Sequence, residues 1–141
     1  MLTDYTAKIV LKELCGKGPQ NYATRIAANA YLGLSSTQPQ ANGQGVTEPA
    51  GNGYSRKLIG VAGVSASQLM ADPETNTISN TNEEIHFNKA TGDWGECLYV
   101  CIFDKATGGN LLAYGQLTQS ISPVANTVPV IEKGAIILSL T

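Results

Sequence analysis

The fold is decided by two apolar segments and the turn between them: Cys97-Leu-Tyr-Val-Cys-Ile-Phe103, Asp104-Lys-Ala-Thr-Gly-Gly109 and Asn110-Leu-Leu-Ala-Tyr-Gly-Gln-Leu-Thr118. An uninterrupted apolar run of this length, bounded by a turn, is typical of a buried strand. The pair Gly108-Gly109 supplies the backbone freedom that a tight reversal needs. This stretch therefore predicts a hairpin of two core strands.

Outside this hairpin, several short segments have the apolar character or the alternation of strands. They are residues 26–34, 54–61, 84–87, 128–131 and 135–140. In the segment 84–87, Ile85 and Phe87 face one side and Glu84 and His86 face the other, which indicates a half-buried strand. The segment 128–131 lies in a polar, proline-containing connection and is expected to be an edge strand.

Two polar stretches are predicted to be loops: residues 35–53, a long exposed loop, and residues 71–82, interrupted by Ile78. Charged residues make up only 14% of the chain, about half the usual share, and glycine is frequent. This composition favours turn-rich β structure over a helical bundle. We expect a mainly β fold: an antiparallel, barrel-like β-sandwich of six to eight short strands with one N-terminal α-helix. A single domain is expected to span residues 1–141, with the sandwich over 26–141.

The best helix candidate is the segment 3–15, which Thr3 or Asp4 can cap at its start. Its polar side is narrow, and apolar residues spread around the rest of the helix. A helix this apolar must be covered, either by its own domain or by a neighbouring subunit. Its apolar residues are therefore the predicted interface: Leu2, Tyr5, Ile9, Val10, Leu11 and Leu14.

The charge pattern and the hydropathy exclude several classes of partner. The formal net charge is −2, and basic residues are scattered singly, so the chain has no stripe that would follow a phosphate backbone. No apolar stretch approaches the length of about 18 residues that a membrane span needs. The start of the chain lacks the basic segment of a signal peptide. We expect no nucleic-acid partner, no membrane partner and no secretory export.

The residue types that usually carry catalysis are sparse. His86 is the one histidine, and with Glu84 on the same strand face it supplies fewer ligands than a zinc site needs. No Gly-x-Ser-x-Gly motif and no phosphate-binding glycine loop that ends in Gly-Lys-Ser or Gly-Lys-Thr occurs. Cys97 and Cys101 have no neighbouring cation that would activate a thiol. We therefore expect no catalytic, cofactor-binding or metal-binding residues.

The three cysteines are expected to be free thiols. Cys97 and Cys101 stand four apart in one predicted strand, so their Cα atoms are roughly 13 Å apart and cannot be bridged. Strand alternation places both on one face, and Cys15 ends the apolar helix. We expect all three thiols to be reduced and mainly buried, as in a protein made in a reducing cytoplasm.

Several segments together resemble a family of small virion structural proteins of tailed bacteriophages, commonly labelled phage tail fibre proteins. The segments are Tyr31–Pro39, Val46–Arg56 with its E-P-x-G-x-G-Y-x-R pattern, Ile85–Gly95, Ile102–Thr118 and the closing Gly134–Leu140. The chain departs from the family at Cys97 and Cys101, where a threonine or small residue is commoner, and in a longer loop over residues 68–81. Trp94 is expected to plug one end of the sandwich, and Asp104 to accept backbone N–H bonds across its turn.

The resemblance implies a non-enzymatic structural component of a phage virion, of the tail-fibre or appendage type. Such a protein would self-associate as a homo-oligomer, dock on other virion proteins and be assembled in the host cytoplasm. Two alternatives stay open: a capsid decoration (cement) protein on the phage head, and a free carbohydrate-binding β-sandwich module. The second would use exposed aromatic residues, but aromatic residues make up only 6% of the chain and lie mostly in predicted strands.

Overall fold

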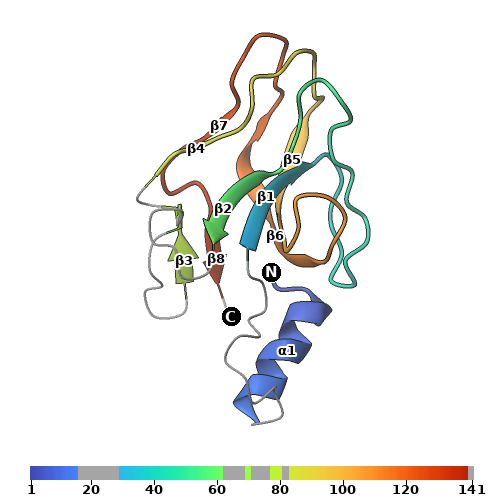
Figure 1. The fold of residues 1–141 in the computed structure, drawn as a ribbon, viewed down its shortest axis with the longest axis vertical. Helices are drawn as coiled ribbons and strands as arrows, with labels where there is room; N and C mark the ends of the chain where they lie inside the picture. The colour runs from blue at the N-terminus through green and yellow to red at the C-terminus, as the bar shows by residue number, and fades with distance from the viewer. Residues whose placement is uncertain (16–28, 62–68, 71–76, 81–82, 140–141) are drawn as a thin grey trace.

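A computed structural model of the protein describes residues 1–15, 29–61, 69–70, 77–80 and 83–139 (Figure 1). These residues form one helix and eight strands. In chain order they are α1 (Asp4–Leu14), β1 (Asn29–Ser35), β2 (Lys57–Val61), β3 (Thr77–Ser79), β4 (Ile85–His86), β5 (Cys97–Phe103), β6 (Leu111–Ile121), β7 (Val130–Ile131) and β8 (Ile137–Ser139).

The largest element is a four-stranded antiparallel sheet with the order β2-β1-β5-β6. The predicted hairpin of β5 and β6 forms half of it, and β1 pairs with β5 from Tyr31 opposite Phe103 to Ser35 opposite Tyr99. Two smaller antiparallel ladders, β4 with β7 and β3 with β8, lie beside this sheet (Figure 1). The described strands do not close into a barrel. The predicted mainly β, antiparallel fold with one N-terminal helix is thus confirmed.

The hydrophobic core forms on both faces of β5. Val100 and Ile102 belong to the main cluster, which also takes residues of β4 and β7 such as Ile85 and Ile131. Phe103, on the opposite face, belongs to a second cluster with Leu111. Because both faces of β5 are covered, the side chains that point to either face of this strand are apolar. The continuous apolar run of β5 follows from this double burial.

The expected placement of the cysteines is wrong in two respects. The register between β5 and β6 is irregular between Cys97 and Tyr99, and this irregularity breaks the simple alternation along the strand. Cys97 consequently packs in the main cluster and Cys101 in the second cluster on the other face. Cys15 is exposed at the end of α1 rather than buried, whereas all three cysteines are free, as expected.

The shorter strands show which sequence signals were sufficient. Along β4 and the residue that follows it, Ile85 and Phe87 are buried and His86 is exposed, so the predicted alternation is confirmed. β7 lies within the predicted edge strand. β3, in contrast, lies in the stretch that we expected to be a loop, because a three-residue strand is too short to show periodicity and depends on its pairing with β8. Residues 26–28, the start of the first predicted strand, lie outside the described residues.

Hydrogen bonds connect the two arms of the predicted loop after β1. Ser35 ends β1, is fully buried, and its Oγ accepts a 2.9 Å hydrogen bond from the Thr47 amide. The amide of Ser36 donates to the carbonyl of Thr47 at 3.0 Å, and the Thr37 hydroxyl donates to the carbonyl of Gly45 at 2.6 Å. These bonds hold the two arms of the loop together, so that Glu48 is brought beside the sheet.

Trp94 is buried, as expected, where this loop meets the core. Its Nε1 donates a 2.8 Å hydrogen bond to the carbonyl of Asn52. Its ring meets the rings of Tyr54 and Phe87 edge to face, with centroid distances of 5.2 and 6.1 Å. Edge-to-face contact is a preferred arrangement of aromatic rings, and here it links the end of the loop to Phe87, the residue after β4.

The thiols provide a test of this packing. Burial raises the pKa of the Cys97 thiol to about 11 and the pKa of the Cys101 thiol to about 12, whereas Cys15 is exposed. Iodoacetamide at pH 8 is expected to label one thiol per folded chain and three in denaturant, as counted by intact-protein mass spectrometry. A Cys15→Ser control should take up no label while folded. Rapid labelling of a second thiol in the folded wild type would contradict the packing.

Candidate functional site

The strongest cluster of charged and polar side chains lies between the loop after β1 and the outer face of β5. Arg56 donates two hydrogen bonds to the Glu48 carboxylate, from Nε to Oε1 at 2.9 Å and from Nη2 to Oε2 at 2.8 Å. Tyr54 Oη donates to the same Oε1 at 2.7 Å and accepts the Leu34 amide at 3.0 Å. The guanidinium carbon of Arg56 lies 3.4 Å from the centroid of the Phe103 ring. Charge, hydrogen bonding and cation–π contact therefore coincide at one residue.

Arg56 also reaches the turn between β5 and β6. Its Nη1 donates to the carbonyls of Lys105 at 2.9 Å and Gly108 at 2.7 Å. The turn is closed by Asp104, whose Oδ1 accepts the Asn110 amide at 2.7 Å, which confirms the expected role of that carboxylate. The guanidinium thus joins the long loop to the hairpin turn.

The cluster leaves no room for a side chain on the neighbouring strand. A Cβ atom added at Gly33 would stand 2.8 Å from Glu48 Oε1 and 3.0 Å from both the Phe103 ring and Tyr54 Oη. Glu48 Oε1 and Tyr54 Oη are held by hydrogen bonds, and the Phe103 ring is covered by the Arg56 guanidinium, so none of them can move away cheaply. Glycine is therefore required at position 33 because the Glu48, Tyr54 and Phe103 side chains lie against the backbone of β1 there, and not because of a turn.

The electrostatics of this cluster are those of a structural ion pair. Burial alone would raise the pKa of Glu48, but the hydrogen bonds from Arg56 and Tyr54 outweigh it, and the pKa of this carboxyl is lowered. Burial and the hydrogen bond to Glu48 raise the pKa of Tyr54 above its usual range. Within the described residues, no buried side-chain nitrogen or oxygen lacks a partner. The charges and hydrogen-bonding groups of the cluster are satisfied by one another.

The other predicted polar pair is on the surface. His86 Nε2 lies 3.1 Å from Glu84 Oε2, and both side chains are about half exposed. No group of three or more histidine, cysteine, aspartate or glutamate residues that could hold a metal ion occurs in the described part of the chain. No helix among the same residues is long and apolar enough to cross a membrane.

The N-terminal residues are fastened to the free edge of β6. The amide of Thr3 donates to the carbonyl of Leu112 at 3.0 Å, the amide of Tyr114 donates to the carbonyl of Met1 at 2.9 Å, and Leu2 bridges to Ala113. Residues 1–3 thus continue the sheet beyond β6, and the helix begins where they leave it.

Two buried threonine hydroxyls fix the first turn of α1 to the same strand. Thr3 Oγ1 donates to the carbonyl of Leu111 at 2.6 Å, and Thr6 Oγ1 donates to the carbonyl of Leu112 at 2.8 Å. The Thr6 amide is 3.4 Å from Thr3 Oγ1, which is the geometry of an N-cap and confirms Thr3 as the capping residue. We call these contacts the threonine anchor.

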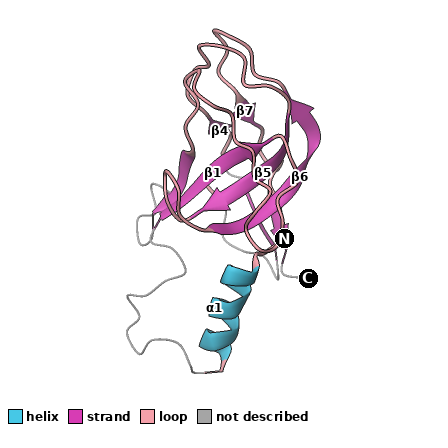
Figure 2. Cartoon of the chain, turned by 90° about the vertical axis from the view of Figure 1, so that its right-hand side faces the viewer, coloured by secondary structure: helices cyan, strands magenta, loops and turns pink. Residues whose placement is uncertain are grey.

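Beyond the threonine anchor, α1 projects away from the sheets (Figures 1 and 2). Of the predicted interface residues, Leu11 is 61% exposed and Tyr5 41% exposed, and Ile9 and Val10 are half-buried. Leu2 packs on the edge of the main core instead. Leu14 is the last residue of the helix. The structure therefore places most of the predicted apolar residues on one projecting element and assigns Leu2 to the sheet.

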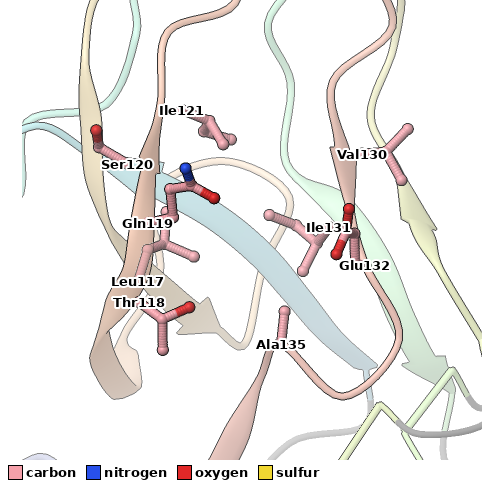
Figure 3. A pocket seen from close by; sticks show the side chains of 9 residues that line it. All are labelled: Leu117, Thr118, Gln119, Ser120, Ile121, Val130, Ile131, Glu132 and Ala135. Atoms are coloured by element: carbon pink, nitrogen blue, oxygen red, sulfur yellow. The ribbon is translucent and has the colours of Figure 1, made fainter.

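A groove of about 150 Å³ lies between the last residues of β6 and the segment that begins at β7. Its apolar part is formed by Leu117, Ile121, Ile131 and Ala135, and Gln119 and Glu132 add polar groups (Figure 3). Among the described residues that line it, Glu132 is the one ionisable group.

Sequence reasoning missed both the threonine anchor and the groove. Thr3 and Thr6 share a helix face with the spacing i, i+3, and a pair of threonines in a first turn is a weak signal by itself. The groove is formed by two segments that do not pair with each other, so no local pattern could indicate it.

The ion pair predicts a large effect of removing its cation. Replacing Arg56 by methionine leaves the Glu48 carboxylate without its charged partner, in a region where the arginine side chain is only 8% exposed. We expect the free energy of unfolding in urea to fall by about 3 kcal/mol. The control Lys89→Met, at an exposed lysine, should change it by less than about 0.5 kcal/mol. Equal effects of the two substitutions would contradict the assignment.

The lowered pKa of Glu48 predicts a pH dependence of stability. Because the folded-state pKa lies below the ordinary value of 4.5, the unfolded chain binds a proton first as the pH falls, and the stability contributed by this carboxylate is lost below about pH 4.5. Urea midpoints measured from pH 6 to pH 3 should therefore fall more steeply for the wild type than for Glu48→Gln. Parallel curves would show that Glu48 does not contribute to the acid sensitivity.

Two comparisons with known proteins bear on the family of this chain. A search of curated proteins finds no match to the chain. A protein-family model, described as Podophage GP4 fiber I protein gp80, matches residues 1–139. This match covers nearly the whole chain and agrees with the resemblance noted from the sequence. The protein belongs to this family of phage fibre proteins.

Proposed function

We propose that the protein is a non-enzymatic structural part of the phage virion that works by self-association and by docking on other virion proteins. In this proposal the contact surface consists of the apolar side chains that α1 leaves exposed or half-buried, those of Tyr5, Ile9, Val10 and Leu11. Leu2 supports this surface from the edge of the sheet. Assembly into the particle takes place in the cytoplasm of the host cell.

The observation that carries the proposal is the exposure of Leu11, at 61%, on a helix that the threonine anchor holds away from the sheets. Full burial of a leucine contributes about 1.5 to 3 kcal/mol, and a helix of 11 residues is marginal without packing. Contact with another protein molecule would cover the apolar face and stabilise the helix at once. The rigid attachment at Thr3 and Thr6 means that little ordering of the helix is needed on binding.

The rest of the molecule supports a structural role rather than a catalytic one. The half-buried charges Glu48 and Arg56 are paired with each other and bonded to neighbouring groups. The one histidine lies on an exposed strand face. Membership of the fibre family points to a fibre or appendage, whereas a decoration protein on the head would use the same helix.

The helix surface can be tested by single substitutions. Leu11→Asp and Tyr5→Asp place a charge in the proposed contact, so each is expected to abolish concentration-dependent association in sedimentation velocity and to reduce incorporation into particles. Lys89→Ala, at an exposed lysine that lies outside both the helix and the groove, is the control and should leave incorporation largely unchanged. Circular dichroism should show folded protein for all three variants. Wild-type protein that stays monomeric and enters particles regardless of Leu11→Asp would refute the proposal.

The position of the protein in the particle requires a separate test. Maleimide-gold that reacts with the exposed Cys15 thiol on purified virions should mark the tail or its appendages in electron micrographs. Virions carrying Cys15→Ser provide the control for labelling of other proteins. Label over the head would refute the fibre role and favour the decoration protein.

A further inference from the structure

Two features that have no partner among the described residues complement each other. The first is the pair Lys8 and Leu11 on α1, which stand at i, i+3 and therefore share one helix face. Both side chains are exposed, and Leu11 is the most exposed of the predicted apolar residues described on the helix. The second is the groove beside β6, which has an apolar floor and one carboxylate, that of Glu132. A helix with an apolar and a basic group thus matches a groove with apolar and acidic groups.

We infer that α1 of one copy docks in the groove of a second copy, with Leu11 seated between Leu117 and Ile131 and Lys8 facing Glu132. This inference rests on the proposed self-association and specifies how it occurs. The contact is head-to-tail, because the donor surface and the acceptor surface are different parts of the chain.

The size of the groove suits such an occupant. A cavity of about 150 Å³ accommodates a benzene-sized group, and the branched end of a leucine side chain is no larger. Figure 3 shows Leu117 and Ile121 on one side of the space and Ile131 on the other, with Ala135 below them. An inserted Leu11 would therefore meet apolar groups on three sides.

The charges favour one orientation of the helix in the groove. Neither Lys8 nor Glu132 forms a salt bridge within the described part of the chain. Glu132 is exposed at the rim, where an ion pair sets orientation and partner choice more than affinity. The opposite charges thus select a second copy of this chain over an occupant that is only apolar.

The helix of the same chain is not positioned to fill the groove. The threonine anchor attaches α1 to β6 at Leu111 and Leu112, whereas the groove uses the other end of that strand, from Leu117 to Ile121. The helix then runs away from the sheets (Figure 1). Each copy consequently offers one helix and one groove, and association can continue from copy to copy until it closes in a ring or is stopped by another protein.

The decisive experiment mixes two variants that are defective on opposite surfaces. Leu11→Asp damages the helix and leaves the groove intact, and we expect it to raise the dissociation constant about 30-fold or more. Gln119→Trp fills the groove from an exposed position of β6 and leaves the helix intact. Each variant alone should be monomeric in sedimentation velocity, whereas an equimolar mixture should form one-to-one dimers and nothing larger. Circular dichroism of each variant checks that both are folded.

The outcomes separate this inference from the proposed function. If Gln119→Trp alone associates as the wild type does, while Leu11→Asp does not, the helices associate without the groove; head-to-tail docking is then wrong and self-association stands. If the wild type is monomeric at all concentrations, both are wrong. A mixture that stays monomeric also overturns the docking.

A charge exchange tests the same contact without filling the groove. Glu132→Lys places two cations opposite each other and should raise the dissociation constant about three- to tenfold. Adding Lys8→Glu in the same chain restores opposite charges across the contact and should recover most of the loss. The control Lys133→Glu changes the neighbouring charge outside the groove lining and should have little effect. Failure of the double variant to recover association would argue against the pairing of Lys8 with Glu132.

Discussion

Arg56 brings a positive charge into a nearly closed site, and its side chain is only 8% exposed. A buried cation is tolerated only where an anion and acceptors are already in position. Glu48 supplies the anion, the carbonyls of Lys105 and Gly108 supply the acceptors, and the Phe103 ring covers the guanidinium. The long loop, the hairpin turn and the outer face of β5 must therefore form together, because each provides one part of the site that the charge requires.

The local sequence pattern was enough to predict strands whose own residues show, by their apolar character, which side chains are buried. The β5–β6 hairpin and the alternation in β4 are of this kind. The irregularity that separates Cys97 from Cys101, in contrast, arises from how β5 meets β6 and has no signature in the run itself. The partners of Arg56 were equally hidden, since a motif indicates a family but not which side chains meet across a sheet.

The candidate interface was predictable in part for a similar reason. An apolar helix after the first residues indicates that something must cover it, and Leu11 and Tyr5 are exposed on such a helix. That the helix stands away from the sheets depends on Thr3 and Thr6, whose hydroxyls bond to main-chain carbonyls of β6. Thr3 is predictable as an N-cap, but no local pattern indicates that its hydroxyl and that of Thr6 bond to a strand more than 100 residues away along the chain.

In α1, attachment to the sheet and the exposed apolar surface use different residues, and this separation affects how such proteins can change. The threonine anchor uses two side chains and main-chain carbonyls, and main-chain groups persist whatever side chains β6 carries. Substitutions in the later turns of the helix leave these bonds unaffected. The contact specificity that we propose for the helix can therefore change, or be redesigned by exchanging the outer turns, while the scaffold that presents the helix stays the same.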